Sequence, residues 1–574
     1  MNTDLFKAEI IEYLSKEKEL IEADIEAHQQ LSDTQKVDDG FLIQNAVVVS
    51  KWGTNCYDLR ATVNNTRLRP GDKIKLQGNK NKDATVIENG LYDISIHCDS
   101  DLNVGDVYDI AVTEAYLLEP LQKILGGLCA GAPGYSFLSQ LSEENPVTAK
   151  GLFPINNTVV ATSMAALKLD ADKDDCCRKI ADNPSVMCLQ GPPGTGKTFC
   201  LAAAVNMVSL SGQKSLVLAL THQAVHNALN QIRKINPAVP IIKVGSSAKA
   251  QSLDPTIGQF SSVRDYAASL TTVSRSGKKK TANPPKDLVI GMTFHAAVVQ
   301  FGLMHGGKLS PTYLFLDEAS QIPMPYASVL GTFGAGSVCL FGDSRQMPPI
   351  FHPDLASHSL SVSILDWCSR LVNVPVSVLH TTYRMNEPIT RCVSRNFYEP
   401  DKITLNSDAS SKGRMLNLPC LTGVFQEPIS IVSRRYSSIY TDSNPEEVKL
   451  VMDLVQQMNA EGLSFDDMAV ITPYRRQVCA LRNEAMVRFG KKHDLLIDTV
   501  ERLQGQEVEC IILSFAASDP IFIAANHDFL FNRNRLNVMI SRARTKVLIF
   551  ASDTIVGELH LDLAMCLPSI PRFL

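Results

Sequence analysis

The sequence has few features of a membrane or secreted protein. No run of about 18 uninterrupted apolar residues occurs among its 574 residues, so we expect no membrane-spanning helix. The first ten residues, MNTDLFKAEI, contain no basic segment followed by an apolar one, so we expect no secretory signal. The 14 cysteines form no C-x-x-C pair and no zinc-finger spacing, which argues against a disulfide or zinc scaffold. These absences predict an intracellular protein, cytoplasmic or nuclear, with reduced thiols.

An excess of charge of one sign is also missing. Lys and Arg total 55 against 60 Asp and Glu, for a formal net charge of −5. This balance excludes a basic coat over the whole surface but leaves room for a local basic channel. Apolar residues make up 45% and charged residues 20%, which is ordinary globular composition and excludes disordered and collagen-like chains.

The first 150 residues divide into charged helical segments and a group of short strands. Residues 1–39 contain a long charged helix with a narrow apolar stripe, which predicts a helical stalk packed on another element. Five short strand-like runs separated by turn signals follow in residues 40–115 and predict a small β-barrel. Residues 116–150 contain further helix and several glycines, and we assign them to the stalk and a linker.

The remainder of the chain alternates strands and helices in two successive blocks. Short apolar runs in residues 151–372 and again in residues 373–574 fit parallel sheets that are covered on both faces. A polar, lysine-containing stretch at about residues 246–286 interrupts the first block and is interpreted as an insertion. In the second block Asn444 followed by Pro445 predicts the start of a helix. The fold class is therefore α/β, with two tandem domains.

A phosphate-binding loop is the strongest motif. The string GPPGTGKT follows an apolar strand at residues 186–189 and opens a helical run, which is the context that a P-loop needs. Its backbone N–H groups and the helix N-terminus suit phosphate oxygens, while Lys197 reaches the β- and γ-phosphates and the hydroxyl of Thr198 ligates Mg²⁺. The predicted nucleotide-binding residues are Gly191, Pro192, Pro193, Gly194, Thr195, Gly196, Lys197 and Thr198.

Two acids and an amide complete the chemistry of the first block. Asp317 and Glu318 end an apolar strand, where Asp317 can hold Mg²⁺ and Glu318 can orient and deprotonate the attacking water. An exposed acidic pair is the alternative for these two residues. Gln346 follows the next strand in the string FGDSRQMPP and can contact the γ-phosphate, although a strand-ending turn explains that string equally well.

These motifs together resemble the helicases of superfamily 1. GPPGTGKT, LDEAS and GDSRQ occur in the order found in that superfamily, and HTTYRM and NFYE resemble stretches of the nonsense-mediated mRNA decay helicase and the immunoglobulin mu-binding helicase. ITPY, VERLQGQE and RLNVMISRAR match the later motifs of that superfamily 1B group in order. The motifs cover about residues 151–555, and the stalk and small barrel also resemble the group.

The resemblance implies two RecA-like domains with ATP and Mg²⁺ in the cleft between them. Arg384 and Arg542 match the γ-phosphate arginines of the family, Tyr383 would stack on adenine, and Glu507 would contact the ribose. A helix-end pair with Arg544 is the alternative for Arg542, and a packed core aromatic is the alternative for Tyr383. The chain departs from the family at Val159, where a glutamine that selects adenine is expected, so nucleotides other than ATP become possible substrates.

Nucleic-acid contacts are also implied by the resemblance. Matching positions end strands in both blocks, where hydroxyls and backbone N–H groups suit phosphate contacts that carry no sequence information. A turn former is the alternative for each residue alone. The positions are Thr221, His222, Thr293, Thr472, Pro473 and Thr499.

The sequence thus predicts an ATP hydrolase that moves along single-stranded DNA or RNA as a monomer. Similarity to the superfamily 1B branch implies movement from 5′ to 3′. The alternatives are an ATPase that remodels nucleoprotein with little unwinding and a nucleotide-switched binding module. A GTPase is excluded because no N-K-x-D string follows the P-loop.

Overall fold

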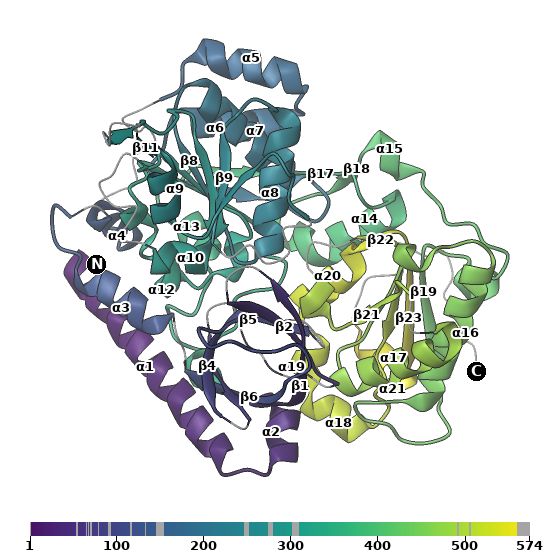
Figure 1. Cartoon of the computed structure of the whole chain (residues 1–574). Coiled ribbons are helices and arrows are strands. Elements are labelled where there is room, and N and C mark those ends of the chain that lie inside the picture. The colour runs from purple at the N-terminus through teal and green to yellow at the C-terminus, as the bar shows by residue number, and fades with distance from the viewer. Residues whose placement is uncertain are drawn as a thin grey trace. The chain divides into compact units, whose positions relative to one another are not determined.

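The computed structural model describes most of the chain (Figure 1). It describes residues 2–559 except for 53–54, 63, 65, 67, 69–71, 79, 90–92, 115–116, 133, 145–153, 246–251, 274–278, 301–308, 491–492 and 504–506. Among the helices so described, none is long and apolar enough to cross a membrane. The junction near residue 151 and the Gln504-Gly505 part of the VERLQGQE motif lie outside the described residues.

The chain forms two compact units that do not follow the order of the sequence. The first unit contains Met1–Leu189, Thr198–Gly342 and Pro349–Ser377, and the second contains Val378–Leu574. Two short motif segments, Gln190–Lys197 and Asp343–Pro348, group with the second unit. The P-loop and the GDSRQ loop are therefore described below with the second unit, although the strands that lead into them belong to the first.

The first unit begins with a long helix, α1 (Thr3–Gln29), capped by the side chain of Asn2. Its buried face contains Phe6, Ile10, Tyr13 and Leu14, which lie in one apolar core with α3 and α4. These four residues recur at helical spacing, so one face is buried while most of the charged residues of α1 stay exposed. The short helices beside α1 are α2 (Asp33–Asp39), α3 (Leu118–Gly126) and α4 (Tyr135–Leu141).

Six strands close a small barrel beside α1 (Figure 1). The strands are β1 (Leu42–Trp52), β2 (Cys56–Arg60), β3 (Lys73–Gln77), β4 (Lys82–Asn89), β5 (Asp93–His97) and β6 (Val107–Glu114), in the order β1-β2-β5-β4-β3-β6. The sequence predicted five strands and missed β4. That strand follows an Asn-Lys repeat, which is typical of a loop, yet its Ala84 and Val86 point into the barrel core.

An eight-stranded sheet forms the rest of the first unit. Its order is β10 (Gly258–Phe260), β9 (Ile241–Val244), β13 (Val289–Thr293), β8 (Ser215–Ala219), β14 (Tyr313–Leu316), β15 (Ser337–Gly342), β7 (Val186–Gln190) and β16 (Val376–Val378). The neighbouring pairs of β8, β9, β13, β14 and β15 are parallel. The six inner strands are buried throughout, as expected for a parallel sheet covered on both faces, whereas the edge strands β10 and β16 are partly exposed.

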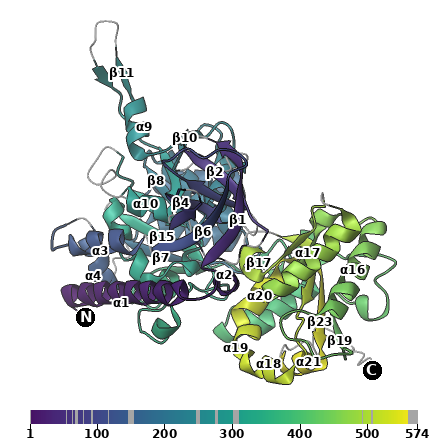
Figure 2. The same cartoon turned by 60° about the horizontal axis from the view of Figure 1, so that its bottom comes forward.

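Helices and a small projection complete this unit. The helices are α5 (Asn157–Leu167), α6 (Ala171–Ala181), α7 (Lys197–Leu210), α8 (His222–Ile235), α9 (Val263–Ser269), α10 (Phe294–Val299), α12 (Met324–Ala327) and α13 (Ile364–Ser369). Strands β11 (Thr271–Val273) and β12 (Lys279–Thr281) pair as a hairpin. Figure 2 shows α9 and this hairpin standing out from the sheet, within the stretch predicted as an insertion.

The second unit contains a parallel five-stranded sheet. Its order is β19 (Ile429–Arg434), β23 (Ala543–Ser552), β22 (Val508–Ser514), β20 (Met468–Ile471) and β21 (Leu496–Asp498). The remaining elements are β17 (Thr381–Thr382), α14 (Glu387–Val393), β18 (Asn406–Ser407), α15 (Ala409–Lys412), α16 (Pro445–Ala460), α17 (Arg475–Phe489), α18 (Pro520–Ala525), α19 (His527–Leu530), α20 (Arg533–Ser541) and α21 (Asp553–Glu558). Two parallel sheets with flanking helices confirm the predicted α/β fold with two RecA-like domains.

Candidate nucleotide site

The P-loop adopts a conformation that only glycine accepts easily. Gly194 and Gly196 have φ angles of +71° and +84°, in the left-handed region where a Cβ atom is strained. A Cβ atom at Gly191 would lie 2.2 Å from Cγ of Lys197. The loop therefore wraps tightly between the end of β7 and the start of α7, with its backbone free to approach an anion closely.

The polar side chains of the loop bond back to the loop itself. Nζ of Lys197 donates to the carbonyl oxygen of Gly191 at 2.8 Å, and Oγ1 of Thr195 donates to that of Pro192 at 2.7 Å. Phosphate oxygens are stronger acceptors for an ammonium group than a neutral carbonyl is. A bound triphosphate can therefore replace the carbonyl of Gly191 as the partner of Lys197.

The two acids of the first unit follow β14 directly. Asp317 is 3% exposed, and its backbone N–H donates to the carbonyl oxygen of Leu218 on the neighbouring strand. Its Oδ1 accepts from the backbone N–H of Glu318 at 3.0 Å. Glu318 has a φ angle of +54°, a left-handed conformation that costs about 1–3 kcal/mol for a residue with a side chain. Such strain at the end of a strand is typical of functional sites and supports a role for Glu318.

The segment that carries Tyr383 and Arg384 lies directly against the P-loop. The backbone N–H of Tyr383 donates to the carbonyl oxygen of Gly194 at 2.8 Å. A Cβ atom at Gly194 would lie 2.5 Å from both Cβ of Arg384 and Oγ1 of Thr382. Tyr383 is 40% exposed, which disfavours the alternative of a packed core aromatic. Residues almost 190 positions apart in the sequence are thereby brought together.

Glu507 bridges two arginines. Its Oε2 accepts from Nε of Arg384 at 2.6 Å, and its Oε1 accepts from Nη2 of Arg544 at 2.9 Å. Partial burial would raise the pKa of Glu507, but the two guanidinium groups outweigh burial and lower it. Arg544 also bonds Glu509 at 3.3 Å. Both oxygens of Glu507 are therefore engaged, and its predicted contact with a ribose stays a prediction.

Arg542 and Gln346 contact each other. Arg542 is 5% exposed, and its Nη2 donates to Oε1 of Gln346 at 3.1 Å. Nε2 of Gln346 donates to Oδ2 of the buried Asp343 at 2.6 Å. Gln346 and Arg542, which are both predicted to contact the γ-phosphate, are thus neighbours. This contact disfavours the alternative that Arg542 bonds only groups at the helix end.

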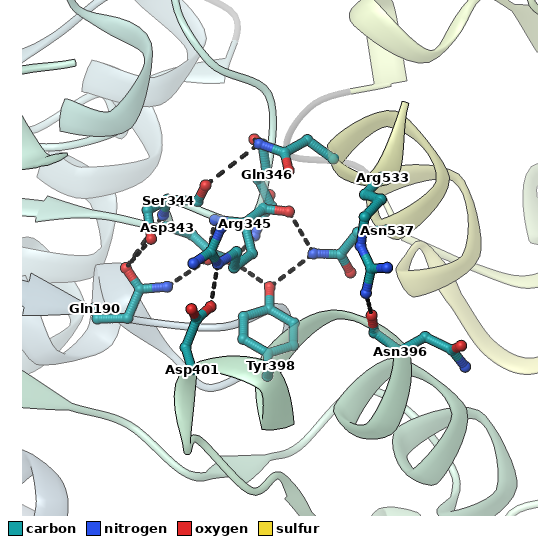
Figure 3. A network of polar contacts seen from close by, with 11 residues as sticks. Gln190, Asp343, Ser344, Arg345, Gln346, Asn396, Tyr398, Asp401, Arg533 and Asn537 are labelled. Atoms are coloured by element: carbon teal, nitrogen blue, oxygen red, sulfur yellow. Dashed lines mark hydrogen bonds and ion pairs between the residues drawn. The ribbon is translucent and has the colours of Figure 1, made fainter. Parts of the chain in front are cut away.

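Sequence reasoning missed the residues that surround this contact. Figure 3 shows Gln190, Asp343, Tyr398 and Asn537 in one hydrogen-bonded network with the GDSRQ loop. The available signals were the aspartate in the GD string and the tyrosine in NFYE, neither of which was assigned a role.

The candidate nucleic-acid positions of the first unit lie at the ends of two adjacent strands. Thr293 ends β13 and pairs with Ala219 of β8, two residues before Thr221. Oγ1 of Thr221 accepts from the backbone N–H of Ala224, and Oγ1 of Thr293 accepts from that of Ala296, each at 3.2 Å. Both threonines therefore cap helices, which is the turn-forming role, and Thr221 is also exposed.

His222 does not contribute positive charge near neutral pH. Burial, with smaller contributions from Lys243, His226 and His295, lowers its pKa to about 3. The imidazole is therefore neutral and acts as a hydrogen-bonding group only.

The second unit repeats this arrangement at a pair of adjacent parallel strands. Thr472 follows β20 and Thr499 follows β21, whose last residues Ile471 and Asp498 pair in register. Thr472 and Thr499 are 0% and 7% exposed, and Pro473 is buried as well. Because these side chains face inward, any contact of theirs with a polynucleotide must come from backbone groups or follow a local rearrangement.

The residues predicted to hold Mg²⁺ suit that ion. Among the residues that the structure describes, no group of three or more His, Cys, Asp or Glu side chains is placed to hold a metal. Mg²⁺ usually binds through one or two protein ligands together with substrate phosphates, and Thr198 and Asp317 provide a hydroxyl and a carboxylate. The positions near the expected adenine-selecting glutamine lie on α5, which Asn156 caps at 2.8 Å and which contains Val159.

Comparisons with known proteins agree with this arrangement. Two family models, each described as an AAA domain, match residues 177–352 and 360–554. The DNA replication ATP-dependent helicase/nuclease dna2 of Schizosaccharomyces pombe is 26% identical over 388 residues, which cover 63% of this chain and 26% of that protein. DNA-binding protein SMUBP-2 of Mesocricetus auratus is 26% identical over 472 residues, which cover 73% of this chain and 45% of that protein.

A third relative is covered more fully. The DNA polymerase alpha-associated DNA helicase A of Schizosaccharomyces pombe is 25% identical over 416 residues, which cover 64% of this chain and 61% of that protein. The chain thus matches between about a quarter and three fifths of the length of these relatives. The two AAA domain models in tandem, whose ranges contain the helicase-like motifs, and the identity to these helicases support a relationship of this chain to superfamily 1 of the helicases.

Proposed function

We propose that this protein is an ATP-dependent translocase or helicase that moves along single-stranded DNA or RNA. The observation that carries the proposal is the meeting of distant motifs at the P-loop and at the GDSRQ loop. Tyr383 and Arg384 pack against Gly194, and Arg542 bonds Gln346. A P-loop that only bound a nucleotide would need none of these groups.

The chemistry of the P-loop and of the two acids assigns the residues that bind ATP and activate water. Lys197 leaves the carbonyl of Gly191 and binds the β- and γ-phosphates of ATP. Thr198 and Asp317 would hold Mg²⁺, which when bound neutralises charge on the phosphates. Glu318 orients the attacking water and accepts its proton.

Arg384 and Arg542 stabilise the charge that develops on the γ-phosphate. Arg384 lies beside the P-loop and is held by Glu507, and Arg542 is held by Gln346 of the GDSRQ loop. In related phosphoryl transfers, an arginine in this role contributes about 10³–10⁵-fold to the rate. Tyr383 offers an exposed ring for adenine, and Val159 in place of a glutamine leaves base selection weak, so other nucleoside triphosphates are expected to serve as well.

Movement follows because the catalytic groups belong to two units. Asp317 and Glu318 belong to the first unit, whereas Arg384 and Arg542 belong to the second. A nucleotide that engages both sets couples its hydrolysis to relative movement of the units. The paired strand ends at Thr221 and Thr293 in one unit, and at Thr472 and Thr499 in the other, would grip the strand in turn. We propose 5′-to-3′ movement by a monomer inside the cell.

The test combines ATPase and strand-displacement assays on matched DNA and RNA duplexes with 5′ or 3′ tails. We expect single strands to stimulate ATP hydrolysis and a 5′ tail to permit displacement. Lys197→Ala and Glu318→Gln should each abolish turnover. Stimulated hydrolysis without displacement on any duplex would favour a nucleoprotein-remodelling ATPase instead. Nucleic-acid binding that is independent of nucleotide, with no ATPase, would reject the motor and leave a binding module.

A further inference from the structure

The NFYE stretch, residues 396–399, has no part in the cycle proposed above, yet it reaches the GDSRQ loop (Figure 3). Residues Ser394–Tyr398 form a single π-helical turn after α14, and such turns occur frequently at functional sites. Tyr398 is fully buried, and its hydroxyl donates to Oδ2 of Asp343 at 2.7 Å. The same hydroxyl accepts from Nδ2 of Asn537 at 2.9 Å.

Asp343 depends on its neighbours because it is completely buried. Burial raises its pKa, an effect opposed by Lys197, by Tyr398 and by Gln346. Besides the tyrosine hydroxyl, Oδ1 accepts from Nε2 of Gln190 at 2.6 Å and from the backbone N–H of Arg345 at 3.1 Å. A buried carboxylate with this number of donors has one defined orientation, since rotation would break several bonds at once.

That orientation determines how Gln346 points. Its Nε2 donates to Oδ2 of Asp343, the oxygen that also accepts from Tyr398. A carboxylate only accepts, so the amide nitrogen must face Asp343 and the amide oxygen must face away. The oxygen consequently meets Nη2 of Arg542 at 3.1 Å.

Helix α20 joins the same assembly. Nδ2 of Asn537 bonds both the hydroxyl of Tyr398 and the carbonyl oxygen of Arg345, the latter at 2.6 Å. Nδ2 of Asn534 bonds the carbonyl oxygen of Gln346 at 2.6 Å. The helix ends at Ser541, immediately before Arg542. The hydroxyl of Tyr398 is thus one of several links between the loop that carries Gln346 and the helix that precedes Arg542.

We propose that Tyr398 is a positioning residue for ATP hydrolysis. Its hydroxyl orients Asp343, which turns the amide of Gln346 toward Arg542 so that both respond to the γ-phosphate together. This inference rests on the proposed function, and it assigns a role to the NFYE stretch.

The test is Tyr398→Phe in the full chain, which removes one hydroxyl and keeps the ring. A hydrogen bond to a charged group corresponds to a factor of roughly ten or more in rate. We expect kcat of the nucleic-acid-stimulated ATPase to fall roughly tenfold or more, while KM for ATP rises by a smaller, several-fold factor. Tyr13→Phe is the matched control, because Tyr13 on α1 is also buried and its hydroxyl bonds Ser361, just before α13, at 2.9 Å. It should leave kcat unchanged.

A second measurement compares the affinities for ADP and for an ATP analogue, which differ by the γ-phosphate, and requires no hydrolysis. The variant should bind ADP like the wild type but bind a non-hydrolysable ATP analogue several-fold more weakly. A variant that is merely less stable would lose affinity for both nucleotides alike.

A double-mutant cycle tests the route through Asp343. If Tyr398 acts through that carboxylate, Tyr398→Phe combined with Asp343→Asn should lower kcat no further than Asp343→Asn alone. Multiplying effects, or a Tyr398→Phe variant with wild-type kcat, would overturn the inference and leave the proposed function intact. Absence of ATPase in the wild type would instead reject the proposed function itself.

Discussion

Replacing Gly194 by alanine should lower the rate of ATP hydrolysis. The same substitution at Gly212, which has a similar backbone conformation, serves as the control. Gly194 has a φ angle of +71°, and Gly212 has one of +73°. A left-handed residue with a side chain costs about 1–2 kcal/mol at either position. A Cβ atom at Gly212 meets nothing within 4 Å, whereas one at Gly194 would lie 2.5 Å from Cβ of Arg384. Overpacking of this kind adds about 1–3 kcal/mol at Gly194 only.

The additional cost should appear as a loss of catalysis. Relief of the clash requires the P-loop and the segment Thr382–Arg384 to separate, and displacements of about 1 Å at a catalytic group can lower rates by roughly 10²-fold. We expect Gly194→Ala to lower kcat by about that factor, and Gly212→Ala to lower stability by about 1–2 kcal/mol with kcat unchanged. Steady-state ATPase and denaturant unfolding of both variants provide the comparison. Equal effects of the two substitutions on kcat would refute the packing of Arg384 against the P-loop.

Two further predictions concern carboxylates of the second unit. Glu507→Gln should lower kcat by roughly tenfold or more, because it weakens a charged hydrogen bond to Arg384. Glu509→Gln is the control, because Glu509 bonds Arg544 and not Arg384. It should change kcat little in the same ATPase assay. Burial raises the pKa of Glu447 from 4.5 to about 7. Between these pH values the folded protein keeps a proton that the unfolded chain releases. The free energy of unfolding should therefore fall by up to about 3 kcal/mol as pH rises from about 4.5 to 7. Glu447→Gln should flatten this slope in denaturant unfolding measured at several pH values, and an unchanged slope would contradict the assignment.

The elements that the sequence predicted best were those encoded by local patterns. The P-loop between β7 and α7 follows from adjacent residues, and Asn444 and Pro445 begin α16 as expected. The alternation of strands and helices predicted two parallel sheets, which the structure confirms. Strand β4 was missed because polar residues at its start gave no strand signal.

The network around Tyr398 was not predictable from local patterns. Tyr398 and Asp343 are 55 positions apart, and Asn537 is a further 139 positions along the chain. Neither spacing is periodic, and a tyrosine in NFYE has the composition of an ordinary core aromatic. The division of the chain into units was equally hidden, since the P-loop leaves a first-unit strand but groups with the second unit. Such contacts depend on how a whole domain packs, and no short window of sequence records that.

The central claim is that arginines of the second unit act on a nucleotide held by the P-loop. Single-turnover hydrolysis of ATP, with nucleotide binding measured separately, tests it most directly in Arg384→Ala and Arg542→Ala. Arg391→Ala is the matched control, because Arg391 lies on α14 and pairs with Glu387 at the surface. The account predicts losses of about 10³–10⁵-fold in the hydrolysis rate for the first two variants, with ATP still bound, and no loss for the control. Hydrolysis by Arg384→Ala and Arg542→Ala at the rate of the control would contradict it.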